Sequence, residues 1–89
     1  MSSMYVVFAL TAGQQQPSFK AYWDRGRASR DAAGLIESGA DTADLYEIEN
    51  VSEAPTAVAG VKTGNGRFLE AHGRRATPEE EREWFWNVL

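Results

Sequence analysis

The spacing of hydrophobic and polar positions indicates two strands near the start of this chain. Residues 4–11 are rich in β-branched and aromatic side chains and are apolar on both alternating faces. This pattern predicts a central strand that is covered on both sides, at least in part. Residues 12–17 are typical of a polar turn, and residues 18–23 then alternate, with Phe19 and Trp23 on one face. We expect the two strands to form a β-hairpin and Trp23 to lie in the core.

A helix is predicted after the hairpin. Asp24 is a favourable N-cap, and Gly39 is placed to end the helix in a left-handed conformation. Between them, apolar residues recur at helical spacing on one face: Ala28, Ala32, Leu35 and Ile36. Gly26 and Gly34 each cost roughly 1 kcal/mol relative to alanine in a helix interior. We therefore expect this helix to depend on docking to the sheet.

The next strand carries the most acidic face of the chain. Residues 43–49 alternate, with Tyr46 and Ile48 on one face and Glu47 and Glu49 on the other. Carboxylates are rarely buried without a partner, so we expect the acidic face to be solvated.

Residues 52–64 admit two interpretations. Ser52 as an N-cap, a proline in the first turn and apolar residues at helical spacing favour a short helix that Gly64 ends. The alternative is a strand, because the Asn-Gly pair that follows is a strong hairpin signal between apolar runs. We prefer the helix. Residues 67–72 form a strand on either interpretation.

The last element has the clearest start. Thr77 is an N-cap, Pro78 occupies the first helical position, and Glu80 completes a capping box. Trp86 lies off the apolar stripe of this helix. The stripe that we expect to dock against the sheet consists of Trp84, Phe85, Val88 and Leu89.

These elements follow the order β-β-α-β-(α)-β-α. The order predicts an α+β fold in a small single domain over residues 1–89. We expect a mostly antiparallel four-stranded sheet with two or three helices packed on one face. The 89 residues include 43% hydrophobic residues and no cysteine, which allows one core held by burial alone. We expect residues 1–3 to be a disordered N-terminus.

Charge is distributed unevenly along the chain. The formal net charge of -4 argues against general nucleic-acid binding, because such proteins carry a basic excess. Residues 20–30 nevertheless hold four cations, whereas residues 41–53 hold five carboxylates and no cation. No run approaches the roughly 18 consecutive apolar residues of a membrane span, and no secretory signal is recognisable. We expect a cytoplasmic protein that does not bind membranes.

Catalytic and metal-binding patterns are missing from the sequence. His72 is the only histidine and there is no cysteine, which excludes the zinc patterns. The chain has no phosphate-binding loop motif and no nucleophile elbow. We therefore expect no enzyme, no cofactor and no metal. The remaining enzymatic hypothesis is an acid–base pair of His72 and Glu70, which would need a pocket around the two side chains.

Two surfaces are candidates for binding. Glu47 and Glu49, together with Trp86, suit a basic protein partner, because acidic surfaces orient such partners and tryptophan is enriched at interface hot spots. The alternative is single-stranded nucleic acid, for which aromatic rings stack on bases and guanidinium groups hold phosphates. Its candidate residues are Tyr22, Arg25, Arg27 and Arg30.

The leading hypothesis is a non-enzymatic protein-interaction module, either a monomer or a homodimer. Its size, acidity and missing chemistry suggest, by analogy alone, an inhibitor from a phage or mobile element. Such a protein would cover a basic surface of a larger complex, as anti-CRISPR and anti-restriction proteins do. A small RNA- or single-stranded-DNA-binding domain is the alternative.

Overall fold

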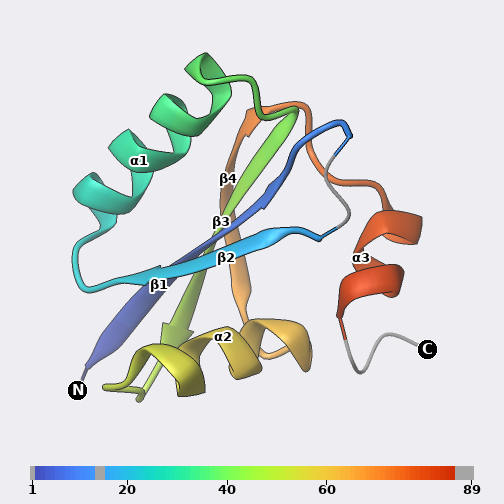
Figure 1. The fold of residues 1–89 in the computed structure, drawn as a ribbon. Helices are drawn as coiled ribbons and strands as arrows, with labels where there is room; N and C mark the ends of the chain where they lie inside the picture. Colours follow the sequence, from blue (N-terminus) through green and yellow to red (C-terminus); the bar gives the residue numbers. More distant parts are fainter. Residues whose placement is uncertain (1, 14–15, 86–89) are drawn as a thin grey trace.

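The strands form one antiparallel sheet in the order β2-β1-β3-β4. In this computed structural model the described residues are 2–13 and 16–85. Figure 1 shows the strands crossing the molecule side by side, with the helices around them. The strands are β1 (Ser3–Leu10), β2 (Ser18–Tyr22), β3 (Thr42–Glu49) and β4 (Arg67–Gly73). The helices are α1 (Arg25–Glu37), α2 (Ala54–Lys62) and α3 (Pro78–Trp84). The predicted α+β class and the order of elements are confirmed.

β1 is the central strand that its two apolar faces predicted. It pairs with β2 on one side and with β3 on the other. Val6 and Phe8 belong to the core on one face of the sheet, and Val7 and Ala9 belong to a second core on the opposite face. The strand begins at Ser3, inside the segment for which we expected disorder.

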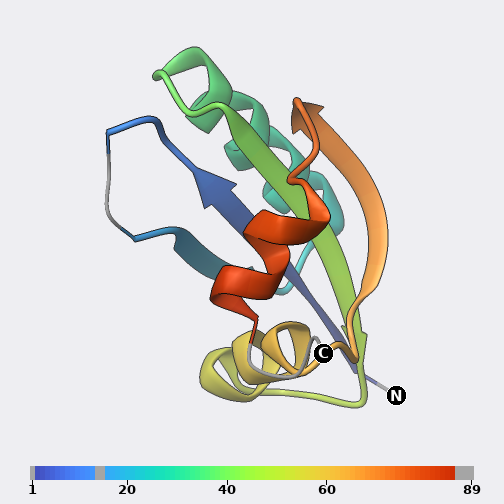
Figure 2. The ribbon, with the colours of Figure 1, turned by 90° about the vertical axis from the view of Figure 1, so that its right-hand side faces the viewer.

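The helices lie on both faces of the sheet, so the expectation that they all pack on one face is wrong. α1 covers the face of Val7 and contributes Ala28 and Ala32 to its core. α2 and the residues around α3 cover the face of Val6. Figure 2 shows α1 behind the strands and α3 in front of them. The physical reason is that β1 is apolar on both faces, and a single helical layer would leave one of them in water.

The segment after β3 is a helix, as we preferred. α2 spans Ala54–Lys62, and Gly64 follows it with a φ of 85°, in the left-handed region. The N-cap is Glu53 without a side-chain hydrogen bond, so the prediction of Ser52 as the cap is wrong. The Asn-Gly pair makes no hairpin. Gly66 instead lets the chain approach β3, since a Cβ there would lie 3.1 Å from Ile48 Cδ1.

Trp23 is exposed, and the prediction that it lies in the core is wrong. β2 ends at Tyr22, and the chain leaves the sheet there because Asp24 must cap α1. The Asp24 carboxylate accepts a hydrogen bond from the Arg27 N–H at 2.8 Å, as predicted for an N-cap. Trp23 is left 61% exposed, whereas Phe19 packs on the core.

α3 starts as predicted and is held to the sheet near its end. Thr77 and Glu80 form the capping box. Phe85, just beyond the helix, is buried against Phe8 with the ring centroids 5.1 Å apart. The Tyr46 hydroxyl donates to a Glu81 carboxylate oxygen at 2.6 Å. Trp86, Val88 and Leu89 lie outside the described residues.

Candidate functional site

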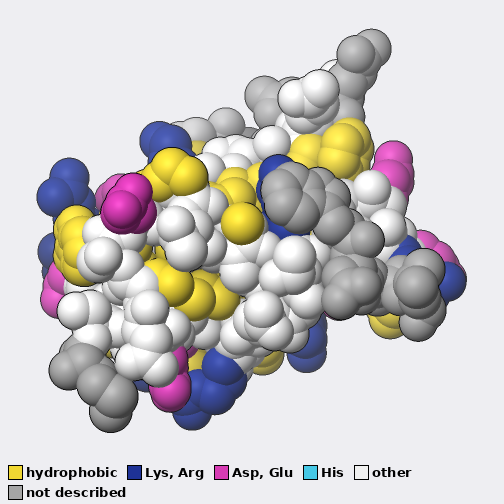
Figure 3. Space-filling model, turned by 90° about the horizontal axis from the view of Figure 1, so that it is seen from below, with side chains coloured by type: hydrophobic (Ala, Val, Ile, Leu, Met, Phe, Trp, Pro, Cys, Tyr) yellow, Lys and Arg dark blue, Asp and Glu magenta, His cyan; other side chains and the backbone are white. Residues whose placement is uncertain are grey.

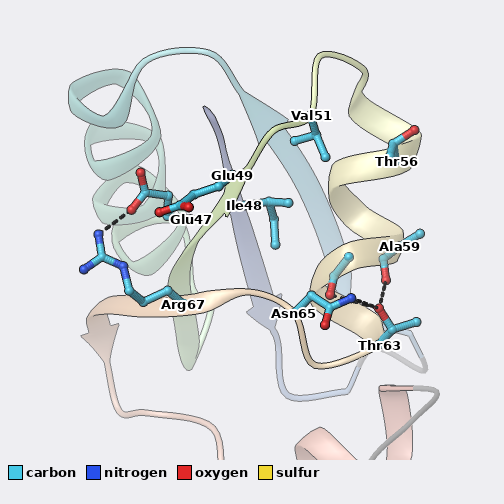
Figure 4. A pocket seen from close by; sticks show the side chains of 10 residues that line it. Glu47, Ile48, Glu49, Val51, Thr56, Ala59, Thr63, Asn65 and Arg67 are labelled. Carbon is cyan, nitrogen blue, oxygen red and sulfur yellow. Dashed lines mark hydrogen bonds and ion pairs between the residues drawn. The ribbon is translucent and has the colours of Figure 1, made fainter. Parts of the chain in front are cut away.

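A hollow lies at the edge of the sheet where β4 begins and β3 extends beyond it. The pairing of β3 with β4 ends at Glu47 opposite Arg67, whereas β3 runs on to Glu49. Beyond that point α2 and the chain leading into β4 bound a hollow of about 460 Å³. Figure 4 shows its lining from close by. We call it the edge hollow.

The two sides of the edge hollow differ in chemistry. Toward α2 the lining is largely apolar and includes Ile48, Val51 and Ala59. Thr63 also lines this side, but its hydroxyl already donates to the Ala59 carbonyl at 3.0 Å. Seen from the side of α2, hydrophobic side chains lie in the middle of the face and charged side chains lie mostly at its margins (Figure 3). The α2 side can therefore bury an apolar group.

The opposite side of the edge hollow carries charge. Glu47 forms an ion pair with Arg67, and the hydrogen bond from that guanidinium lowers the pKa of Glu47. Glu49 is exposed, and the structure shows no ion pair for it among the described residues. Two carboxylates against one guanidinium leave the rim with an excess of negative charge. The structure thus brings Glu47 and Glu49 to one site, while Trp86 lies outside the described residues.

The structure brings together only some of the candidate nucleic-acid-binding residues, which are Tyr22, Arg25, Arg27 and Arg30. Tyr22 and Arg30 line a hollow of about 280 Å³ together with Lys20. Burial and then the hydrogen bond and charge of Asp31 raise the pKa of Tyr22 to about 12. Its side chain is partly buried against the core on the α1 face, which leaves less of the ring to stack on a base. Arg25 turns toward Glu70, with 3.7 Å between the guanidinium nitrogen and the carboxylate oxygen. Arg27 is exposed.

His72 and Glu70 meet Ser29 of α1, a contact that the sequence analysis missed. The Ser29 hydroxyl donates to Glu70 Oε1 at 2.6 Å, and His72 Nε2 lies 3.1 Å from the same oxygen. These contacts, the serine one first, lower the pKa of Glu70, which makes it a weak base. The edge hollow and the hollow beside Tyr22 are lined by other residues. The cluster joins α1 to β4. Ser29 Oγ and Glu70 Oε1 both lie beside His72 Nε2, at 3.4 Å and 3.1 Å, whereas a catalytic triad places its serine and its carboxylate on different ring nitrogens.

Asp44 is the second chemical feature that the sequence analysis missed. It is 0% exposed in the middle of β3. One carboxylate oxygen accepts a hydrogen bond from the Ala76 N–H at 3.2 Å, and the other has no hydrogen-bond partner among the described residues. Burial raises the pKa of Asp44 to about 6. Sequence carried no signal for this, because the carboxylate is covered by the segment between β4 and α3, which is distant along the chain.

Comparisons of this chain with family models, with curated proteins and with solved structures give no match. Within the described residues, no three histidine, cysteine or acidic side chains are grouped so that they could hold a metal ion. No helix of that part of the chain is long and apolar enough to cross a bilayer.

Proposed function

We propose that this chain is a protein-binding module without catalytic activity, and that it holds a basic segment of another protein in the edge hollow. The observation that carries the proposal is the position of Glu47 and Glu49 on the rim of an otherwise mainly apolar hollow. An apolar floor supplies binding free energy through burial, and a charged rim selects and orients the partner.

The enzymatic alternative has less support. The one histidine of the chain and Glu70 are engaged with each other and with Ser29. Neither His72 nor Glu70 lines the edge hollow or the hollow beside Tyr22. An inhibitor from a phage or mobile element that covers a basic surface of a larger complex is a more specific form of the same proposal, and it stays a prediction.

Charge reversal at the rim tests the proposed function. Glu49→Lys is expected to weaken capture of the partner at least about tenfold, because the cation of the partner would meet a like charge in place of a carboxylate. The measurement is an affinity pull-down of the tagged protein from lysate of its source cell, with nuclease and without it, read by quantitative mass spectrometry.

The matched control is Glu37→Lys, which makes the same change of charge at an exposed position at the end of α1. It should leave capture within about twofold of the parent protein, and both variants should melt within a few degrees of it, since exposed charge changes have small effects on stability. Equal capture by the parent and both variants would remove the edge hollow from the proposal.

A second candidate function is favoured by the exposure of Trp23. Its indole is 61% exposed, and it lies between β2, which carries Lys20, and α1, which carries Arg27 and Arg30. An exposed aromatic ring beside cations is the arrangement that binds single-stranded nucleic acid, with Trp23 rather than Tyr22 as the stacking group.

The fluorescence anisotropy of a labelled single-stranded oligonucleotide, to which the protein is added, measures this second function. Trp23→Ala should weaken binding about tenfold, because base stacking contributes about 1–3 kcal/mol per base. Arg27→Gln should lower the salt dependence of binding, since one phosphate contact is lost. Arg25→Gln is the control, because its guanidinium is directed at Glu70 and a small effect is expected. If the affinity for the oligonucleotide were unchanged in Trp23→Ala and independent of salt concentration, this function would be excluded.

A further inference from the structure

At the end of β3, the backbone N–H and C=O of Glu49 face the edge hollow, as the hydrogen bonding of the next residue indicates. The Asn50 N–H donates to the Ser2 carbonyl at 2.7 Å, on the side of β1. The peptide bond between Glu49 and Asn50 is trans, because the described chain has no cis peptide bond. In a trans peptide the C=O points opposite to the N–H, so the Glu49 carbonyl points away from β1. It faces the side on which β4 pairs with the earlier residues of β3.

On the side of β3 away from β1, no strand of the described chain lies beside Glu49. The N–H and the C=O of a residue point to the same side of a strand, so the Glu49 N–H also faces the hollow. β4 begins only at Arg67, opposite Glu47. Asn65 lies two residues before the start of β4. Its backbone N–H donates to the Gly60 carbonyl at 2.8 Å and is therefore not directed at β3. Glu49 therefore presents both a backbone donor and a backbone acceptor to whatever enters the edge hollow.

The side chains around this site alternate in the manner that a strand requires. Glu47 and Glu49 lie on the α1 face of β3, and Ile48 lies on the α2 face. In an antiparallel pair, directly opposite residues share a face of the sheet. Arg67 of β4 is opposite Glu47 and forms an ion pair with it. A cation opposite Glu49 would repeat the same arrangement one step further along the sheet.

We infer that the edge hollow binds the partner as a short extended segment that continues the line of β4 along β3. A lysine or arginine of the segment lies opposite Glu49, exchanges two backbone hydrogen bonds with it and directs its side chain to the Glu47 and Glu49 carboxylates. The neighbouring residues of the segment direct apolar side chains to Ile48, Val51 and Ala59. This is strand addition to a sheet edge, with pockets for alternate side chains. The inference rests on the proposed function.

The experiment uses the full chain and three synthetic peptides, titrated while the amide signals of the protein are followed by NMR. The first peptide is acetylated, amidated Val-Lys-Val. The second carries an N-methyl group on the lysine nitrogen, which removes the donor that would bond to Glu49. The third carries N-methyl groups on both valine nitrogens, which point away from β3 in the inferred register, since only every second residue of an added strand bonds to the edge.

We expect the first and third peptides to shift the Glu49 amide signal with affinities within about twofold of each other. The second peptide should bind about tenfold more weakly, because a lost backbone hydrogen bond and the added methyl group together cost on the order of 1.4 kcal/mol. Equal weakening by both kinds of N-methylation, or no shift at Glu49 with any peptide, would overturn strand addition. In that event, loss of lysate capture in Glu49→Lys would still support the proposed function, and unchanged capture would contradict both.

Discussion

Phe8→Ala is expected to destabilise the fold by roughly 3–5 kcal/mol, the range for removing a buried phenylalanine. Phe8 is 0% exposed on the central strand. Its ring stacks on Phe19 with centroids 4.9 Å apart and meets the edge of the Phe85 ring at 5.1 Å. It therefore links β1 to β2 and to the chain beyond α3. A domain of this length has a total stability of about 4–13 kcal/mol, so this single change removes a large part of it.

Urea unfolding followed by circular dichroism measures the effect. Trp23→Ala is the matched control, since it also removes a large aromatic ring but from a 61% exposed position, and it should change stability by less than about 1 kcal/mol. If the two variants lost similar stability, the assignment of Phe8 to the core and Trp23 to the surface would be wrong.

The local features of the fold were predictable because their causes are close together in the sequence. The capping box of Thr77 and Glu80 and the cap of Asp24 each involve residues three positions apart. The placement of α1 on one face and of α2 and α3 on the other was not predicted, although the two apolar faces of β1 already required cover on both sides. The order of elements along the chain does not determine which face of the sheet each helix covers, whereas the apolar pattern of β1 requires cover on both faces.

The candidate site was predictable only as a pair of residues. Alternation placed Glu47 and Glu49 on one face of β3, and the structure puts both on the rim of the edge hollow. The hollow itself depends on where β4 begins and on how closely Gly66 approaches Ile48, which are tertiary features. The contact of Ser29 with Glu70 spans 41 positions of the sequence and left no local signal.

We expect Asp44 to make the stability of the fold depend on pH over part of the acidic range. Burial is the main cause of its raised pKa, and the charge of Glu81 acts in the same direction. The Ala76 N–H and the guanidinium groups of Arg75 and Arg74 act in the opposite direction and do not compensate. The pKa is about 6 in the folded chain against 3.8 for the ordinary group. The folded state thus holds the proton more tightly than the unfolded state.

The sign of the effect follows from that difference. Stability from Asp44 is fully present below about pH 4, where both states are protonated, and it is lost as the pH rises through about 6. Between about pH 6.5 and about pH 4.5, protonation of Asp44 should add about 2 kcal/mol to the free energy of unfolding. Carboxylates with lowered pKa values, such as Glu80 at about 2, act in the opposite sense at lower pH, where they lose their ion pairs.

Asp44→Asn is therefore expected to be more stable than the parent protein by about 3 kcal/mol near neutral pH, because the carboxamide keeps an acceptor for Ala76 and cannot ionise. Its advantage should shrink as the pH is lowered to about 4.5, where the parent carboxyl is itself neutral in the fold. Chemical unfolding of both proteins across this range measures the difference. A difference that is constant with pH would show that Asp44 does not titrate in the fold between these values. A parallel series with Glu79→Gln controls for the loss of one negative charge, since Glu79 is exposed on α3.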